Sequence, residues 1–426
     1  MRSDIHIPLF EMVMCFSGAL DLVSREVVDH HKKVAFIAYS LASELGLPKE
    51  ERTNMLLAGA LHDSGAFSRT ERLAGLNFEL VNPHKHAERG YLLLKEFEPF
   101  SKIAELVRFH HVPWNNGRGV EFKNQMVSFG SHILHLADRV SVLMKNDTSI
   151  LGQVSGICSS IEKQSGKMFE PKLVKAFKSL AAKEYFWFDV ISAEVTDILA
   201  KKAGNTAVEL NLEELLKLSN LFRHIIDFRN PFTANHSLGV AATAEKLGSL
   251  MGFSTRESQM LRVAGYLHDL GKLAVPVEVL DKPGKLTEEE GYIIKSHTYY
   301  TYRILESITG LDDINAWASF HHERLDGKGY PFHYQDEDLP LGSRIMAVAD
   351  VFTAISEDRP YRKGMESDKA LAILNQMTEE SALDANVVLT LRRNYEELNY
   401  VRAEAQKKSE AEYYEFGRQS EYVLDA

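Results

Sequence analysis

The sequence has few cysteines and no long apolar run. Only Cys15 and Cys158 occur among its 426 residues, so a disulfide framework is not expected and a reducing compartment is favoured. No uninterrupted apolar run approaches the ~20 residues that a membrane span needs. The apolar stretch 7–23 is interrupted by Glu11 and Asp21 and lacks the basic start and cleavage site of a signal peptide. These absences predict a cytoplasmic protein without a membrane partner.

The chain also lacks an excess of basic residues. Its 49 Lys and Arg against 60 Asp and Glu give a formal charge of −11. Broad nucleic-acid binding needs a basic face that neutralises phosphates, so duplex nucleic acid is not an expected partner. Any anionic substrate must instead meet a local basic pocket. The ordinary composition, 45% hydrophobic and 26% charged, predicts a globular protein with room for two or three domains.

Strand patterns are scarce and helix signals dominate, which predicts an all-α fold. Three candidate helix starts have the capping-box pattern, in which a polar residue is followed three positions later by Glu. They are Asn211 with Glu214, Ser254 with Glu257, and Thr287 with Glu290.

An internal repeat defines the domain organisation. The segment from His30 to Gly46 matches the segment from His236 to Gly252, each with an apolar helical face before the glycine. The later intervals also correspond: His30 to His62 and His236 to His268 are both 32 residues, His86 to His110 and His297 to His321 are both 24, and His111 to Asp138 is 27 where His322 to Asp350 is 28. We therefore predict two homologous helical modules in tandem, residues 1–206 and residues 207–426.

The stretch from His268 to Lys272, His-Asp-Leu-Gly-Lys, predicts a cation site. A buried carboxylate is costly unless it is paired or bound to a metal. Imidazoles and carboxylates together suit Fe, Mn, Ni or Zn better than Mg or Ca. Seven side chains of the second module are the predicted ligands: His236, His268, Asp269, His297, His321, His322 and Asp350. Each histidine alone is better explained by a structural role, but the set occurs twice at matching spacings.

Two divalent ions about 3.5–4 Å apart require a bridging ligand, and the two oxygens of a carboxylate suit that role. This favours Asp269. A water between the ions would lose a proton near neutral pH and become a nucleophile for in-line attack on phosphorus. Lys272, one helical turn after Asp269, would protonate a leaving oxygen or stabilise phosphate charge, unless it is a surface lysine.

A family resemblance follows from these residues. His268 to Lys272, the run His321-His322-Glu-Arg-Leu-Asp-Gly-Lys-Gly-Tyr330-Pro331, Asp350 and Arg359-Pro-Tyr-Arg362 together resemble the bacterial HD-GYP phosphodiesterases, over about residues 230 to 380. The resemblance implies an all-helical fold, a bimetal site made by the seven residues above, Lys272 as a catalytic residue with Asp269, and hydrolysis of cyclic dinucleotides.

The resemblance also places Tyr330, Arg359 and Arg362 in the substrate pocket. Their chemistry agrees, because guanidinium groups bind phosphate bidentately and an aromatic ring stacks on a base. The structural alternatives are a turn aromatic for Tyr330 and an ion pair with Asp358 for Arg359.

Two positions depart from the family pattern. Some members have Glu four residues before the first histidine and hold a third metal, whereas this chain has Phe232 there, so two ions are predicted. Many members have Asp three residues after the last ligand. Here Thr353 occupies that position, which we expect to change the hydrogen bonds around the ligands or the pocket, not the number of ions.

The first module keeps a full ligand set but loses the catalytic accessories. Its candidate second metal site comprises His30, His62, Asp63, His86, His110, His111 and Asp138, with Glu26 four residues before His30. Ala66 occupies the position of Lys272, the run Val112 to Gly117 replaces the Gly-Tyr-Pro signature, and no Arg-Pro-Tyr-Arg follows Asp138. We predict a non-catalytic module that regulates, dimerises or supports the second, and its metal occupancy stays open.

The sequence thus predicts a metal-dependent phosphodiesterase that uses two divalent ions, Fe, Mn or Ni in preference to Mg. A bridging hydroxide would convert a cyclic dinucleotide to a linear 5′-phosphorylated dinucleotide. The tandem of an HD and an HD-GYP module resembles bacterial phosphodiesterases of 3′3′-cGAMP, which makes 3′3′-cGAMP a candidate alongside c-di-GMP. The alternatives are an HD phosphohydrolase of linear nucleotides, a diiron oxygenase and a non-catalytic cyclic-dinucleotide receptor. The oligomeric state stays open, with a homodimer as one alternative.

Overall fold

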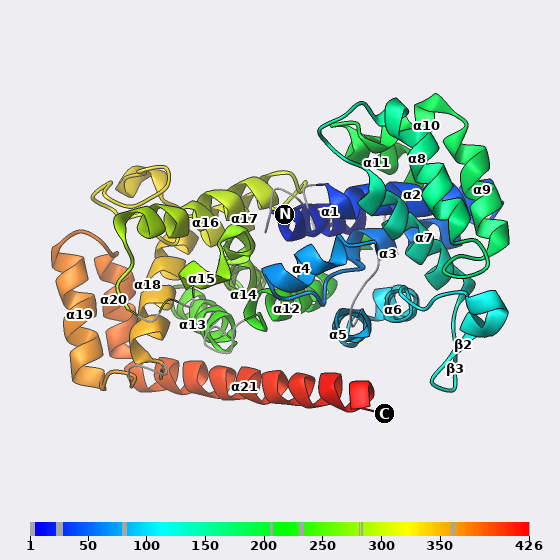
Figure 1. Cartoon of the computed structure of the whole chain (residues 1–426). Helices are drawn as coiled ribbons and strands as arrows, with labels where there is room; N and C mark the ends of the chain where they lie inside the picture. Colours follow the sequence, from blue (N-terminus) through cyan, green and yellow to red (C-terminus); the bar gives the residue numbers. More distant parts are fainter. Residues whose placement is uncertain are drawn as a thin grey trace. The chain divides into compact units, whose positions relative to one another are not determined.

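The computed structural model describes residues 5–22, 29–78, 83–204, 208–229, 234–280, 282, 284–358 and 363–425. Helices dominate these residues, and the strands form two antiparallel pairs of two-residue segments, β1 with β4 and β2 with β3. The predicted all-α fold is therefore confirmed. The chain divides into two compact units, which are described separately (Figure 1). The predicted boundary at residues 206 and 207 stays a prediction.

The first unit comprises the described parts of Met12–Val208 and Gln419–Ala426, the latter being the end of the C-terminal helix. Its elements are α1 (Leu9–Asp21) from Met12 onward, α2 (His30–Glu44), α3 (Lys49–Leu61), α4 (Arg69–Gly75), α5 (His84–Leu94), the 3₁₀ helix η1 (Glu98–Phe100), α6 (Ser101–Arg108), η2 (Asn115–Val120), β2 (Glu121–Phe122), β3 (Gln125–Met126), α7 (Phe129–Leu143), α8 (Ile150–Lys163), α9 (Pro171–Ala181), α10 (Glu184–Val190) and α11 (Val195–Ala203).

The second unit comprises residues 5–11 and the described part of Glu209–Arg418. Its elements are β1 (Ile7–Pro8), β4 (Glu209–Leu210), α12 (Leu212–Asp227), α13 (His236–Leu250), α14 (Thr255–Leu267), η3 (Leu270–Ala274), α15 (Val277–Leu280), α16 (Glu288–Glu306), α17 (Asp312–Ser319), η4 (Asp336–Asp338), α18 (Leu341–Ser356), α19 (Ser367–Glu379), α20 (Ala385–Arg393) and α21 (Tyr395–Asp425), the long red helix of Figure 1.

Each unit is built around one helix that is buried on nearly all sides. In α2 the residues from Val34 to Ala42 are all buried, and in α13 so are those from His236 to Ala244. An apolar helix without a polar face can exist in water only if other helices surround it. In the first unit α3 and α7 pack against α2, and in the second unit α14 and α18 pack against α13. Both central helices begin at a predicted ligand histidine.

The helix boundaries follow the signals in the sequence. The three predicted capping boxes form at the starts of α12, α14 and α16, with side-chain and backbone hydrogen bonds in both directions, so these predictions are confirmed. Gly46 and Gly252 follow the ends of the central helices with φ of 70° and 91°. This left-handed backbone conformation favours glycine and ends a helix.

A glycine two residues after each His-Asp pair allows the ligand segments to approach one another. A Cβ atom added at Gly271 would lie 1.9 Å from the His297 carbonyl oxygen, and one added at Gly65 would lie 2.2 Å from the His86 carbonyl oxygen. Only a residue without a Cβ fits such a backbone contact. The glycine therefore sets the distance between each aspartate and the next predicted ligand histidine.

No helix in the described ranges is long and apolar enough to cross a membrane.

Replacing Gly271 by alanine tests this packing constraint. The new methyl group would collide with the backbone of α16, so we expect a loss of about 1–3 kcal/mol in the free energy of unfolding. Gly291 lies in the same helix with no atom within 4 Å of an added Cβ, and Gly291→Ala should instead stabilise the protein by about 0.5–1 kcal/mol. Urea denaturation of both variants measures the difference, and equal effects would contradict the proposed close approach.

Candidate metal centre

The second unit brings all seven predicted ligand residues together. They are His236 at the start of α13, His268 and Asp269 directly after α14, His297 in α16, His321 and His322 directly after α17, and Asp350 in α18. Six of the seven are buried, whereas the side chain of His322 is 31% exposed. Most of these residues lie at or just beyond a helix end, where the packing of helices directs side chains into a common space.

The ligand atoms form two groups with Asp269 between them. Ligand atoms of His236, His268 and Asp350 lie within 4.8 Å of one another, and so do those of the three remaining histidines. Asp269 Oδ2 is 3.3 Å from His268 Nε2, and its Oδ1 is 3.6 Å from His297 Nε2. One carboxylate thus faces both groups, as a residue that bridges two ions must.

Backbone hydrogen bonds fix which ring nitrogens face the centre. The Nδ1 atoms of His268, His297 and His321 donate to the carbonyl oxygens three residues earlier, at 2.9, 2.6 and 2.7 Å. A carbonyl oxygen only accepts, so these Nδ1 atoms carry the hydrogen and a neutral ring has its lone pair on Nε2. Burial lowers the pKa of His297 to about 3 and that of His321 well below its usual value, so both rings are neutral.

Two of these lone pairs face each other. His297 Nε2 and His321 Nε2 are 3.4 Å apart, and neither carries a hydrogen when its Nδ1 donates to a carbonyl. Such a contact is unfavourable unless a positive group lies between or beside the two nitrogens. The donor set of neutral imidazoles and carboxylates therefore fits a divalent transition metal.

The carboxylates stay ionised. Although burial alone would raise it, the neighbouring His268 and Lys272 hold the pKa of Asp269 well below its usual range. Burial also opposes ionisation of Asp350, but the hydrogen bond with His236 and the nearby His322 lower its pKa. The centre therefore combines two buried negative charges with mostly neutral rings, which gives a divalent cation a favourable electrostatic environment.

His236 differs from the other ligand histidines because it lies between two carboxylates. Its Nε2 is 3.1 Å from Asp350 Oδ1 and its Nδ1 is 3.1 Å from Glu357 Oε2. Burial would lower its pKa, but Glu357 and Asp350 outweigh burial and raise the pKa of His236 to about 10. A proton on His236 Nε2 thus lies next to Asp350, at the position where a metal ion would bind.

Lys272 lies against Asp269. The 3₁₀ helix η3 places its Nζ 2.6 Å from Asp269 Oδ2, with the lysine side chain 24% exposed. Burial would lower its pKa, but Asp269 raises it, so the ammonium group is retained at neutral pH. The side chain offers a fixed positive charge at the open edge of the centre.

The loop that follows the histidine doublet carries Tyr330 over His322, with ring centroids 5.0 Å apart. Tyr330 N donates to the His322 carbonyl at 3.2 Å, and buried Glu323 Oε1 accepts from Phe332 N at 2.7 Å. A Cβ added at Gly329 would lie 2.4 Å from Glu323 Cα, so this glycine is required for the loop to close. The Gly-Tyr-Pro motif therefore sets an aromatic ring beside a predicted metal ligand.

The first unit brings together the corresponding seven residues, all of them buried. Asp63 Oδ1 is 3.2 Å from His86 Nε2 and 3.8 Å from His110 Nε2, and its Oδ2 is 3.4 Å from His62 Nε2. His30 Nε2 is 3.3 Å from Asp138 Oδ1, and His86 Nε2 is 2.9 Å from His111 Nε2. The Nε2 atoms of His62 and His110 are buried without a hydrogen bond among the described residues, so this donor set also fits a metal ion.

Arg139 sets the first centre apart. Its guanidinium group is buried and donates to Asp138 Oδ2 at 2.6 and 3.1 Å, and it also donates to the carbonyl oxygens of Gly75, Asn77 and Phe78. The backbone after α4 is thereby held at Asp138. His111 is 5% exposed, whereas the side chain of its counterpart His322 is 31% exposed, so the first centre is closed at the ligand where the second is open.

The segment after the first doublet has a different role from the Gly-Tyr-Pro loop. The amides of Trp114, Asn115 and Asn116 donate to the carbonyl oxygens of residues 168, 167 and 166, at 3.0, 2.7 and 2.7 Å. This segment is tied to the loop after α8 and presents no aromatic ring to the centre in the manner of Tyr330.

Three residues near the centres were not predicted from the sequence: Glu357, Arg139 and Lys295, whose Nζ lies 5.5 Å from the Tyr330 ring centroid. Two of them had a sequence signal. Glu357 follows Asp350 by seven residues, which is two helical turns, and Arg139 is a charge in the apolar helix α7 directly after a predicted ligand. Glu26, Phe232, Arg359 and Arg362 lie outside the described residues.

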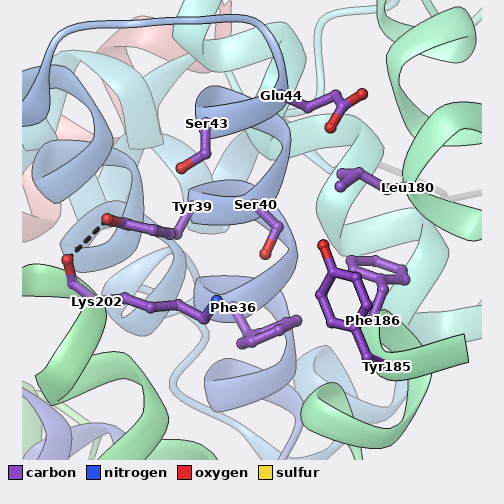
Figure 2. Close-up of a pocket in the computed structure, with 9 residues that line it drawn as sticks. All are labelled: Phe36, Tyr39, Ser40, Ser43, Glu44, Leu180, Tyr185, Phe186 and Lys202. Atoms are coloured by element: carbon purple, nitrogen blue, oxygen red, sulfur yellow. Dashed lines mark hydrogen bonds between the residues drawn. The ribbon is translucent and has the colours of Figure 1, made fainter. Parts of the chain in front are cut away.

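A separate cavity of about 170 Å³ lies in the first unit (Figure 2). It is lined by Phe36, Tyr39, Ser40, Ser43, Glu44, Leu180, Tyr185, Phe186 and Lys202. The Tyr39 hydroxyl donates to the Lys202 carbonyl at 2.8 Å, drawn as a dashed line in Figure 2. None of the predicted site residues lines this cavity, so the histidine and aspartate clusters remain the candidate site.

Comparisons with known proteins agree with this organisation. A family model described as "HD domain" matches residues 220–387, and another with the same description matches residues 27–143. The predicted tandem of HD-type domains is therefore confirmed.

Two known proteins and one solved structure are similar to this chain. The 3′3′-cGAMP-specific phosphodiesterase 1 of Vibrio cholerae serotype O1 is 31% identical over 399 residues, which cover 91% of this chain and 92% of the relative. The cyclic di-GMP phosphodiesterase response regulator RpfG of Xanthomonas campestris pv. campestris is 39% identical over 168 residues, 39% of this chain and 44% of the relative. A crystal structure of a cyclic GMP-AMP-specific phosphodiesterase of V. cholerae has a TM-score of 0.66 at 24% identity, covers 92% of this chain and 98% of its own, and shows the same fold.

The facing lone pairs predict a measurable response to metal. Mn²⁺ at about 100 times its dissociation constant should stabilise the protein by about 2.7 kcal/mol per independent site and raise the melting temperature. His321→Gln replaces the imidazole by an amide, which is a weaker ligand for Mn²⁺, so it should reduce the Mn²⁺-dependent rise. Calorimetry with and without chelator measures this rise in both proteins, with Mg²⁺ as the control that gives a smaller rise. An undiminished Mn²⁺ response in the variant would contradict ligation by His321.

Proposed function

Because this chain belongs to the HD-domain family of cyclic-dinucleotide phosphodiesterases, we propose that its second module hydrolyses 3′3′-cGAMP or c-di-GMP to a linear 5′-phosphorylated dinucleotide. One observation carries the proposal: the second centre is an open set of metal-type ligands with Lys272 and Tyr330 at its edge. The first centre has equivalent ligands without these two accessories.

Similarity over the whole chain favours 3′3′-cGAMP as the first substrate to test. The relative that matches 91% of this chain is named as specific for 3′3′-cGAMP, whereas the c-di-GMP phosphodiesterase RpfG matches 39%.

We assign the metal ligands to His236, His268, Asp269, His297, His321, His322 and Asp350, with Asp269 between two ions. Divalent ions held there would supply Lewis acidity and lower the pKa of water, which is the chemistry that phosphodiester hydrolysis needs. Fe, Mn or Ni suit this mixture of imidazole and carboxylate better than Mg.

For Lys272 we favour stabilisation of phosphate charge over proton transfer. A general acid works best when its pKa lies near the working pH, whereas Asp269 raises the pKa of Lys272. A fixed ammonium group 2.6 Å from Asp269 is suited to the charge that develops on a phosphoryl oxygen. The leaving 3′ oxygen would then take its proton from another donor.

Tyr330 and the two arginines complete the proposed substrate site. The half-buried Tyr330 ring beside His322 offers a face on which a nucleobase stacks. Arg359 and Arg362, although outside the described residues, follow Asp350 closely enough in sequence to contact the second phosphate. Lys295 adds a positive charge next to the same ring.

The first module is proposed to be non-catalytic and to regulate or support the second. Arg139 neutralises Asp138 and fixes the backbone after α4 beside it, while Ala66 offers no ammonium group. A metal ion fits its ligands, but among the described residues none of them is as exposed as His322 of the second centre. A cytoplasmic location and a homodimer remain predictions.

Incubating Mn²⁺-loaded protein with 3′3′-cGAMP, c-di-GMP and c-di-AMP tests the function. Chromatography should show a linear dinucleotide with a 5′ phosphate, formed faster from 3′3′-cGAMP. Cleavage of linear nucleotides alone would favour the HD phosphohydrolase alternative, and binding without cleavage under Fe, Mn or Ni would favour a receptor.

Lys272→Ala separates the role of the lysine from metal binding. Loss of one charge-stabilising group should lower kcat about 10²–10³-fold while the metal content stays unchanged. Lys328→Ala is the matched control, because Lys328 belongs to the same family signature but its side chain is 78% exposed. Metal content by atomic emission and steady-state kinetics check the prediction, and loss of metal in Lys272→Ala would make the lysine structural.

A further inference from the structure

The Nδ1 atom of His236 contacts a side chain, whereas three other ligand histidines use a backbone carbonyl. His268, His297 and His321 each donate from Nδ1 to the carbonyl oxygen three residues earlier. His236 is the first residue of α13, so the helix itself supplies no such carbonyl. Its Nδ1 instead lies 3.1 Å from Glu357 Oε2. The ring orientation of this ligand therefore depends on a side chain from another helix.

In the first module a different residue contacts the Nδ1 atom of the first ligand histidine. His30 is the first residue of α2, and its Nδ1 lies 3.0 Å from the hydroxyl of Ser141, three residues after Asp138. The position three residues after Asp350 is Thr353, whose buried hydroxyl has no hydrogen-bond partner within the described ranges. In the second module the hydrogen-bond partner of the first ligand histidine thus lies one helical turn further along. It is the carboxylate of Glu357 instead of a hydroxyl.

Glu357 is itself held by the C-terminal helix. It is 2% exposed and ends α18, and its Oε2 also accepts from Gln406 Nε2 at 2.9 Å. Gln406 Oε1 accepts from Arg402 Nη1 one turn earlier in α21. Because Arg402 can only donate, the amide of Gln406 must turn its NH₂ group to Glu357.

The packing of α13 leaves room for this contact. A Cβ added at Gly239 would lie 2.8 Å from Gln406 Cγ. Gly239 is three residues after His236, so it lies one helical turn along the same face. The glycine lets the Gln406 side chain pass α13 and reach the carboxylate.

We infer that Glu357, oriented by Gln406 of α21, is the positioning residue that holds His236 as a metal ligand. A carboxylate that accepts from Nδ1–H fixes the tautomer, leaves the Nε2 lone pair for the metal and makes the ring a stronger ligand. The C-terminal helix thereby takes part in metal binding without touching the metal. This inference rests on the proposed function of the same site.

The test compares Mn²⁺ affinity in the full-length protein, with free Mn²⁺ followed by electron paramagnetic resonance. Glu357→Gln should weaken Mn²⁺ binding at one site about 10–100-fold, because the negative charge next to His236 Nδ1 is lost. Gln406→Leu keeps the side-chain size but removes the donor, and should weaken binding in the same direction to a smaller extent. The Mn²⁺ concentration for half-maximal hydrolysis should rise in parallel.

Glu412→Gln is the matched control. Glu412 also lies in α21, where it contacts Arg223 and His224 but not the ligand histidines. Its substitution should leave Mn²⁺ affinity unchanged. Wild-type affinity in both Glu357→Gln and Gln406→Leu would overturn the inference, and so would an equal loss in Glu412→Gln. If Glu357→Gln does not fold, Gln406→Leu alone decides.

The two proposals fail in different ways. If wild-type protein binds Mn²⁺ but cleaves no cyclic dinucleotide, the proposed function fails, while the ratio of variant to wild-type affinity still tests Glu357. If wild-type protein binds no Mn²⁺, both are overturned.

Discussion

Neutral imidazole lone pairs and ionised carboxylates meet inside an apolar helical interior, where they repel one another. The rest of the structure depends on how this repulsion is offset. The backbone carbonyls force the lone pairs of His297 and His321 to face each other, and Asp269 adds a buried charge next to them. Without a cation this arrangement is unfavourable. The buried central helix and the glycine contacts nevertheless press these groups together, so the fold itself creates a site for metal.

The two modules share a set of metal-type side chains but differ in the residues that we propose for catalysis. Both bring seven histidines and aspartates together with similar distances. They differ in the charge beside the carboxylates: Lys272 lies at an open edge of the second centre, whereas Arg139 is buried against Asp138 and ties down the backbone after α4. A positive charge that neutralises a carboxylate inside the protein stabilises the fold, while one at an open edge remains available to a substrate.

The sequence predicted the all-α fold, the tandem HD domains and the helix starts because these depend on local patterns. Capping boxes such as Ser254 with Glu257 are contained within four residues, and the repeat preserves helix lengths. The grouping of the ligand residues also followed from spacing, although their role as metal ligands stays a prediction. The contact of Glu357 with Gln406 could not be predicted, because the two residues are 49 positions apart in sequence and no periodicity links α18 with α21.

The position of a ligand in its helix decides how easily its environment can change. The backbone carbonyls that accept from His268, His297 and His321 cannot be removed by substitution of a side chain. A histidine at the first position of a helix depends on a side chain and can exchange it. The change from Ser141 in one module to Glu357 in the other is what this freedom allows, and the Thr353 hydroxyl has no hydrogen-bond partner in the part of the chain that the structure describes. We therefore regard the first ligand of each module as the one through which the surrounding helices adjust the strength of metal binding.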